Sequence, residues 1–166
     1  NERWYLIGTP LATEEFPYRE DFYVNLPLDR MNGVTAVDGV EYVDCDEYFE
    51  ERYEDIVGIT WIKEEEQREI IFAVKDSYVG YVDTKPLHGS QIKFPAEKQK
   101  ELHDKNAAFA GYTFYSINVK PNRELYNALY RNGEDIILIS PTGIREKMIQ
   151  ELTASLDRLK SVRGEC

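Results

Sequence analysis

Few side chains in this sequence are of types that could carry out catalysis or hold a metal ion. The histidines are His88 and His103, and no cysteine lies at ligand spacing from either, so we expect no zinc site. His88 and Ser90 could form a base and a nucleophile, but no carboxylate is placed to orient the imidazole. The favoured interpretation is that both side chains hydrogen-bond the turn after Pro86. The sequence has no phosphate-binding glycine loop, so we expect neither an enzyme nor a cofactor.

Arg30 is the strongest candidate for contact with a ligand. In an extended chain it shares one face with Leu26 and Leu28, so a cation stands in line with two apolar side chains where the predicted strand ends. Such a cation must reach the protein rim, an acidic partner or a bound anion. An ion pair with a nearby acid and contact with an anionic ligand both stay open. The full set of candidate ligand-binding residues is Arg30, Tyr5, Arg3 and His88.

Two short strands are expected to position this arginine. Residues 3–8 alternate Trp4, Leu6 and Gly8 against Tyr5 and Ile7, which predicts a strand covered on both faces. We expect Trp4 to be buried, with stacking on a nucleobase as the alternative. Residues 23–31 repeat the pattern. Residues 34–43 predict a third strand, broken by a hairpin turn at Asp38-Gly39.

The charge of the chain is unevenly distributed. Its net charge is −11 over 166 residues; residues 1–60 hold 15 acidic and 4 basic side chains, and residues 61–166 hold 16 of each. Because the first part repels a phosphate backbone, we expect the chain not to hold duplex DNA by itself. No apolar run approaches the roughly 20 residues that span a bilayer. The two cysteines make no disulfide framework, which indicates the cytoplasm.

The rest of the sequence predicts an acidic connector helix and an α+β domain. The connector helix is expected over residues 46–55, with a buried stripe of Tyr48, Phe49, Tyr53 and Ile56. Strands are predicted at residues 69–75, 90–94, 112–120 and 135–140, and helices at residues 78–85, capped by Asp76-Ser77 and stopped by Pro86, and at residues 123–131. Residues 95–110 are expected to form an exposed connection containing His103. This βαββαβ order matches a ferredoxin-like sandwich, followed by a terminal helix over residues 142–162 whose apolar stripe is long enough to cover a partner subunit.

The motifs Trp4-Tyr5-Leu6 and Leu28-Asp29-Arg30 resemble those of the WYL domain, an Sm-like barrel of bacterial transcription regulators. The succession of later segments is similar to the C-terminal extension of these regulators, so the resemblance covers nearly the whole chain. It implies a partial Sm-like β-barrel in residues 1–45, a connector in 46–62, and a ferredoxin-like domain with a terminal helix in 63–166. Relatives often carry an arginine where this chain has Val24.

The resemblance implies the effector-sensing and dimerising region of a transcription regulator. An oligonucleotide or nucleotide-like anion at Arg30 would favour one arrangement of the two domains, and an N-terminal domain outside this chain would bind DNA. The family normally supplies a further strand before Trp4, so we expect an open edge there that invites pairing with a second copy. The alternative is a ligand-free oligomerisation scaffold. A cytoplasmic homodimer without membrane contact is expected in either case.

Overall fold

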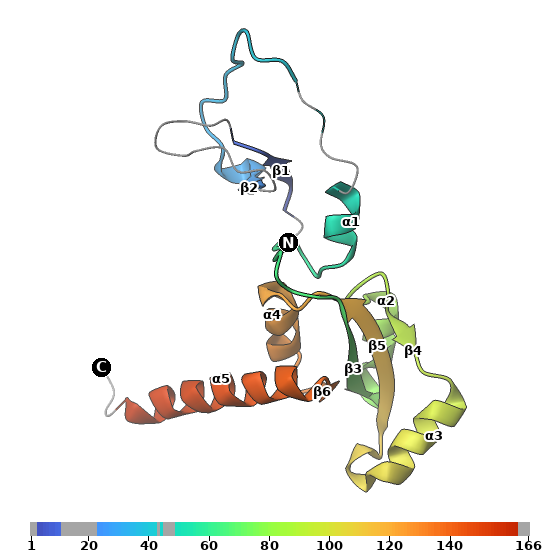
Figure 1. Ribbon diagram of the computed structural model, residues 1–166. Coiled ribbons are helices and arrows are strands. Elements are labelled where there is room, and N and C mark those ends of the chain that lie inside the picture. Colours follow the sequence, from blue (N-terminus) through green and yellow to red (C-terminus); the bar gives the residue numbers. More distant parts are fainter. Residues whose placement is uncertain (1–2, 11–22, 43, 45–48, 163–166) are drawn as a thin grey trace. The chain divides into compact units, whose positions relative to one another are not determined.

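A computed structural model describes residues 3–10, 23–42, 44 and 49–162. The chain divides into two compact units, Asn1–Phe49 (unit 1) and Glu50–Cys166 (unit 2). The expectation of a mixed α+β protein is confirmed, because the described residues form two antiparallel sheets and five α-helices (Figure 1). No helix in these ranges is both long and apolar enough to cross a membrane.

Unit 1 contains a two-stranded antiparallel sheet of β1 (Tyr5–Gly8) and β2 (Val24–Pro27). The prediction of a third strand is wrong for the described part, since residues 34–42 contain no strand. Asp38-Gly39 does form the expected turn, with Gly39 at a φ of 75°. The valines of this segment are exposed. Their alternation does not produce a strand, because a strand needs a neighbour for its backbone groups and a core for one face.

The connector helix is present as α1 (Phe49–Glu54). The expected start near residue 46 and the side chain of Tyr48 lie outside the described residues. Phe49 and Tyr53 are half-buried, and Ile56, just beyond the helix, is buried. The predicted apolar stripe therefore contributes to packing mainly at its C-terminal end.

Unit 2 is built on a four-stranded antiparallel sheet with the order β4-β5-β3-β6. The central strands β3 (Arg68–Lys75) and β5 (Tyr112–Val119) pair along their whole length, and β6 (Ile136–Ser140) lies on the other side of β3. These three strands confirm the sequence prediction. The fourth, β4 (Ile92–Lys93), is shorter than the predicted 90–94.

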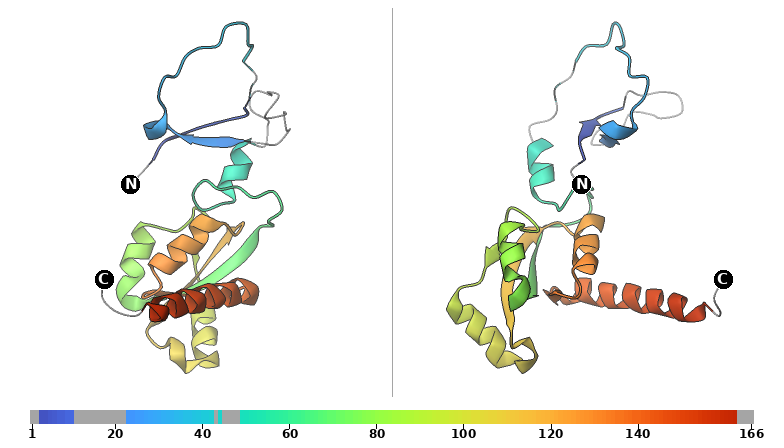
Figure 2. Two further views of the ribbon diagram at one scale, coloured as in Figure 1. Left: turned by 90° about the vertical axis from the view of Figure 1, so that its left-hand side faces the viewer. Right: turned by 180° about the vertical axis from the view of Figure 1, so that it is seen from behind.

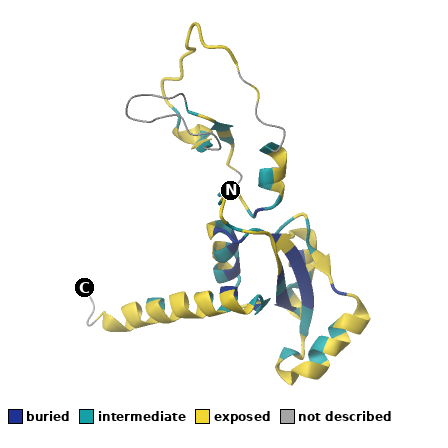
Figure 3. Ribbon diagram, viewed as in Figure 1, coloured by how far each residue is buried: buried dark blue, intermediate teal, exposed yellow. Residues whose placement is uncertain are grey.

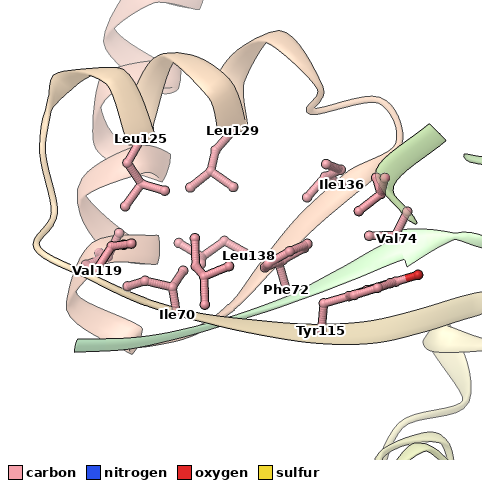
Figure 4. Close-up of a cluster of buried hydrophobic side chains, with 12 residues drawn as sticks. Ile70, Phe72, Val74, Tyr115, Val119, Leu125, Leu129, Ile136 and Leu138 are labelled. Atoms are coloured by element: carbon pink, nitrogen blue, oxygen red, sulfur yellow. The ribbon is translucent and has the colours of Figure 1, made fainter. Parts of the chain in front are cut away.

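Two helices, α2 (Val79–Thr84) and α4 (Arg123–Arg131), pack on one face of this sheet. Figure 4 shows the α4 leucines pointing toward the apolar side chains of the strands. The cluster contains Ile70, Phe72, Val74, Tyr115, Val119, Leu125, Leu129, Ile136 and Leu138. Full burial of each large aliphatic or aromatic side chain stabilises the fold by roughly 1.5–3 kcal/mol, so this face forms the main core.

The start of α2 differs in detail from the prediction. Residues Asp76–Tyr78 form a 3-10 turn before the helix, and the Asp76 carboxylate accepts a hydrogen bond from Thr113 Oγ1 at 2.8 Å instead of capping α2. The side chain of Asp76 therefore ties this turn to β5.

The predicted exposed connection over residues 95–110 is wrong. It forms α3 (Ala96–Lys105) and a 3-10 turn (Ala107–Phe109), which supply Leu102 and Phe109 to a second, smaller cluster on the sheet. That cluster is centred on Ala73, Phe94 and Phe114. Unit 2 consequently has a helix between its second and third strands, which the predicted βαββαβ order lacked.

Side chains of α3 take the place of a strand beside β5. The Gln99 amide accepts from Phe114 N at 2.8 Å and donates to Phe114 O at 2.9 Å. His103, which we expected to be exposed, is half-buried, and its Nε2 donates to Tyr112 O at 2.7 Å. Because β4 pairs only with Tyr115 and Ser116, these side chains satisfy Phe114 N and Tyr112 O, which β4 does not reach, and Gln99 shares Phe114 O with the Phe94 N–H at 3.0 Å.

The terminal helix α5 (Thr142–Ser161) confirms the predicted element. Ile144 is buried and Met148 packs against the main core, but the apolar residues beyond them are exposed. Figure 3 shows α5 as largely exposed after its first turn. Both Figure 1 and the right-hand view of Figure 2 show α5 running away from the sheet of unit 2.

Candidate ligand-binding site

The hairpin of unit 1 carries an exposed apolar face. Leu6 pairs with Leu26, and the Leu28 N–H donates to Trp4 O at 3.0 Å, which extends the pairing past the end of β1. Because side chains alternate along a strand and align across a pair, Trp4, Leu6, Leu26 and Leu28 lie on one face. We name these four residues the hairpin face. All four are exposed, and Trp4 most of all, at 78% of its accessible surface.

The exposure of Trp4 and Leu6 overturns two expectations, that Trp4 is buried and that both faces of the strand are covered. The alternation was identified correctly, but no described element packs on this side of the hairpin. Tyr5 and Ile7, on the opposite face, are half-buried. Of the two aromatic neighbours, Trp4 is therefore the more available for contact with a ligand.

The two arginines of unit 1 lie at the end of this hairpin in different settings. The Arg3 Nε lies 3.2 Å from Asp29 Oδ1, in an ion pair whose side chains are both about half exposed. Arg30 is exposed and has no hydrogen bond or ion pair with any residue that the structure describes. Within the part of unit 1 that the structure describes, the arginine that pairs with an acid is therefore Arg3 and not Arg30.

Arg30 does not share a strand face with the two leucines as predicted. β2 ends at Pro27, and Leu28–Arg30 form a 3-10 turn. Proline has no N–H to continue a strand ladder and restricts its own φ, which is −68° at Pro27. The position of Arg30 is therefore set by the turn and not by strand alternation. The same turn begins at Leu28, whose N–H donates to Trp4 O.

His88 belongs to unit 2 and its contacts support the turn interpretation. Its Nδ1 accepts the Ser90 N–H at 3.1 Å and lies 2.8 Å from Ser90 Oγ. Ser90 Oγ also accepts from Asn118 N at 2.9 Å and lies 3.2 Å from Asn118 O. These contacts join the loop before β4 to the end of β5.

The arrangement of unit 1 suits recognition of an aromatic anion. An exposed indole can stack on the face of a nucleobase, and a guanidinium can hold a phosphate through two parallel hydrogen bonds. Among the described residues, no group of three or more histidine, cysteine, aspartate or glutamate side chains gathers to hold a metal ion. For binding such an anion, the hairpin region offers the exposed ring of Trp4 and the guanidinium groups of Arg3 and Arg30.

Sequence reasoning missed a polar cluster around Asp83 in unit 2. The Tyr115 hydroxyl donates to Asp83 Oδ1 at 2.7 Å, and Lys93 Nζ lies 3.1 Å from Asp83 Oδ2. The hydrogen bond from Tyr115, followed by that from Lys93, lowers the pKa of the Asp83 carboxyl. Burial, followed by the bond to Asp83, raises the pKa of Tyr115. Lys93 and Tyr115 face each other across β4 and β5, so the pairing that joins them could be known only from the sheet.

Sequence reasoning also missed the attachment of the connector to α4. Asn122 is 2% exposed, and its Oδ1 accepts from Leu125 N at 2.9 Å as the N-cap of α4. Its Nδ2 donates to Val57 O at 2.8 Å and to Thr60 O at 2.9 Å. An asparagine three residues after a strand and just before a helix is a recognisable cap signal, but its second role requires the fold.

No protein-family model matches the sequence, and no curated protein matches it.

Proposed function

We propose that this chain is the effector-sensing and dimerising region of a bacterial transcription regulator of the WYL type. Its ligand is an anion that carries a nucleobase, either a short single-stranded oligonucleotide or a nucleotide. The observation that carries the proposal is the exposure of Trp4 on the hairpin face together with the exposure of Arg30 in the 3-10 turn that follows β2. The protein works in the cytoplasm without catalytic turnover of the ligand, and a separate domain of the parent protein binds DNA.

The topology supports the fold expected of such a region. The strand order β4-β5-β3-β6, with α2 and α4 on one face, supports a ferredoxin-like domain, and α3 is an addition to it. A two-stranded sheet with an exposed apolar face is marginally stable by itself and needs further strands or a packed neighbour. This need supports the proposal that the hairpin of unit 1 is part of an Sm-like barrel.

The charge of the first 60 residues limits the size of the ligand. A long nucleic acid would meet an excess of acidic side chains, whereas a short one can contact Arg30 and the hairpin face with few phosphates near the acids. With one or two phosphates neutralised, the slope of log K against log salt should be only about −0.7 to −1.4 for a single strand. A shallow salt dependence thus distinguishes this mode from binding by a basic surface.

The proposal is tested by fluorescence anisotropy with a labelled eight-nucleotide oligothymidine, and by competition with mononucleotides. Arg30→Ala should weaken binding about 10- to 100-fold, since a hydrogen bond to a charged group contributes about 1.5–3 kcal/mol. Trp4→Ala removes the stacking platform, which is worth about 1–3 kcal/mol per base, and should weaken binding to a similar degree.

The matched controls are Tyr42→Ala and Arg158→Ala. Tyr42 is an exposed aromatic residue of unit 1 outside the hairpin, and Arg158 is an exposed arginine of α5. Both should bind like the wild type. Absence of saturable binding, or an equal loss in Tyr42→Ala and Trp4→Ala, would remove the sensing proposal.

A ligand-free oligomerisation scaffold is the second candidate, and the exposed apolar stripe of α5 favours it. The two functions differ in one measurable respect. A scaffold associates with itself and binds none of the probes, whereas a sensor binds them through Trp4 and Arg30.

A further inference from the structure

The second half of α5 lacks cover from the described residues. The helix has 20 residues, and its first turns are held by Ile144, by Met148 and by the Tyr130 hydroxyl, which donates to Glu151 Oε2 at 2.6 Å. From residue 149 to the end of the helix the large apolar side chains are between 48% and 72% exposed: Ile149, Leu152, Leu156 and Leu159. We name these four residues the α5 seam. Helices shorter than about 12–15 residues are marginal in water by themselves, so a projecting helical segment gains from a partner.

The spacing of the α5 seam specifies the shape of that partner. The intervals of three, four and three residues place Ile149 and Leu156 at the first apolar position of successive heptads, and Leu152 and Leu159 at the second. A stripe confined to these positions is the narrow seam of a helix that pairs with another helix. A helix that lies on a sheet or in a core normally has a wider apolar face.

The charges around the α5 seam favour a second copy of the same helix. The flanking heptad positions within the helix hold Met148, Thr153, Ser155 and Lys160, so no acidic side chain borders the seam. Residues 142–161 contain three acidic and four basic side chains, in a chain whose net charge is −11. Two copies can therefore approach along this helix without the like-charge repulsion that residues 1–60 would cause.

We propose that α5 pairs with α5 of a second copy through the α5 seam, forming a two-helix junction between protomers. This inference rests on the dimerising part of the proposed function and names the surface that performs it. The exposed segment, residues 149–161, is about 20 Å long. The area that two segments of this length can bury between them is smaller than the roughly 1,200–2,000 Å² of an interface of standard size. The dimer should therefore dissociate in the micromolar range, on the order of 1–100 µM.

The test is sedimentation velocity of the whole chain with reducing agent present, over a range from 1 to about 200 µM that brackets this constant. The weight-average mass should rise from that of one chain, 19.4 kDa, toward twice that value. Leu156→Glu places a charge in the α5 seam and should raise the dissociation constant at least about 100-fold. Gln150→Glu adds the same side chain on the outer side of the helix and should change it by less than about twofold.

Two further measurements are needed to interpret a loss of dimerisation in Leu156→Glu. Far-ultraviolet circular dichroism establishes that Leu156→Glu keeps the helix content of the domain, since the substitution lies at an exposed position. The oligothymidine titration, repeated on Leu156→Glu, separates this inference from the sensing proposal. Loss of the dimer with binding retained supports both.

Several outcomes would overturn the pairing of α5. These are a wild type that stays monomeric across the whole range, equal dimerisation by Leu156→Glu and Gln150→Glu, and assembly into open-ended oligomers. If the wild type is monomeric yet binds the oligonucleotide, the pairing is refuted and the sensing proposal stands. If the wild type pairs through α5 yet binds no probe, the sensing proposal is refuted and the pairing stands.

Discussion

Replacement of the buried Asn122 tests whether the connector segment is an integral part of unit 2. One side chain serves two purposes, because Oδ1 caps α4 at Leu125 N while Nδ2 holds the carbonyls of Val57 and Thr60. The connector approaches α4 closely at Gly58, whose φ is 78°. A Cβ built on Gly58 would lie 2.6 Å from the Cγ of Glu124, so only glycine fits there. The two carbonyls therefore have a fixed position relative to Asn122.

The expected cost of Asn122→Ala follows from its three hydrogen bonds. Loss of an N-cap costs about 1 kcal/mol. Loss of each connector hydrogen bond costs roughly 0.5–1.5 kcal/mol. We therefore expect the free energy of unfolding of unit 2 to fall by about 2–4 kcal/mol. A side chain with no connector role would cost only the capping contribution.

Asn122→Asp separates the two roles of the side chain. The carboxylate keeps an acceptor for Leu125 N, and its charge suits the N-terminus of α4. It cannot donate to Val57 O or Thr60 O, and it sets negative charge against two carbonyl oxygens. Asn122→Asp should therefore destabilise unit 2 at least as much as Asn122→Ala does.

Urea denaturation followed by the fluorescence of Trp61 measures this effect. Trp61 lies on the connector, and its ring centroid is 5.3 Å from Lys120 Nζ, so its emission reports on the attachment. A Trp4→Phe background removes the other tryptophan, which belongs to unit 1. A loss below about 1 kcal/mol for Asn122→Ala, or full stability of Asn122→Asp, would refute the reasoning, because either result means that the connector bonds contribute nothing.

Two other predictions concern the sheet of unit 2. Gln99→Glu removes the amide donor that serves Phe94 O and Phe114 O and sets a carboxylate against both carbonyls, so it should lower the free energy of unfolding by about 1–3 kcal/mol, although Phe114 O keeps its bond from Phe94 N; thermal denaturation against the exposed control Gln150→Glu checks this, and equal midpoints would contradict it. Because its hydrogen bonds lower the pKa of Asp83, its stabilising contribution is complete above the ordinary carboxyl value of about 4 and is lost as the pH falls through the lowered value. Tyr115→Phe removes the larger cause, so the variant should lose less stability than the wild type between about pH 5 and pH 2; equal losses would contradict this role.

The candidate site was only partly predictable. Arg30 was identified from its neighbours as a cation that needs an acidic partner or a bound anion, and the structure gives it no partner among the described residues. The structural reason expected from the sequence, a strand that aligns Arg30 with two leucines, is wrong. β2 ends at Pro27, and a 3-10 turn follows it. The burial expected for Trp4 failed because alternation predicts which side chains share a face, whereas burial depends on whether another element covers that face.

The sequence by itself determined the elements whose apolar pattern matches their own period. Ile70, Phe72 and Val74 alternate in β3, and the bounds of α4 follow from a cap at Asn122 and a helical apolar stripe. Tertiary structure decided the role of residues 95–110, where few apolar residues stand among lysines and glutamates. The shortness of β4 leaves Phe114 N without a strand partner, and only the folded sheet brings Gln99 of α3 to it. Periodicity is a local property of the chain, whereas the satisfaction of backbone groups and the cover of an apolar face depend on segments distant in sequence.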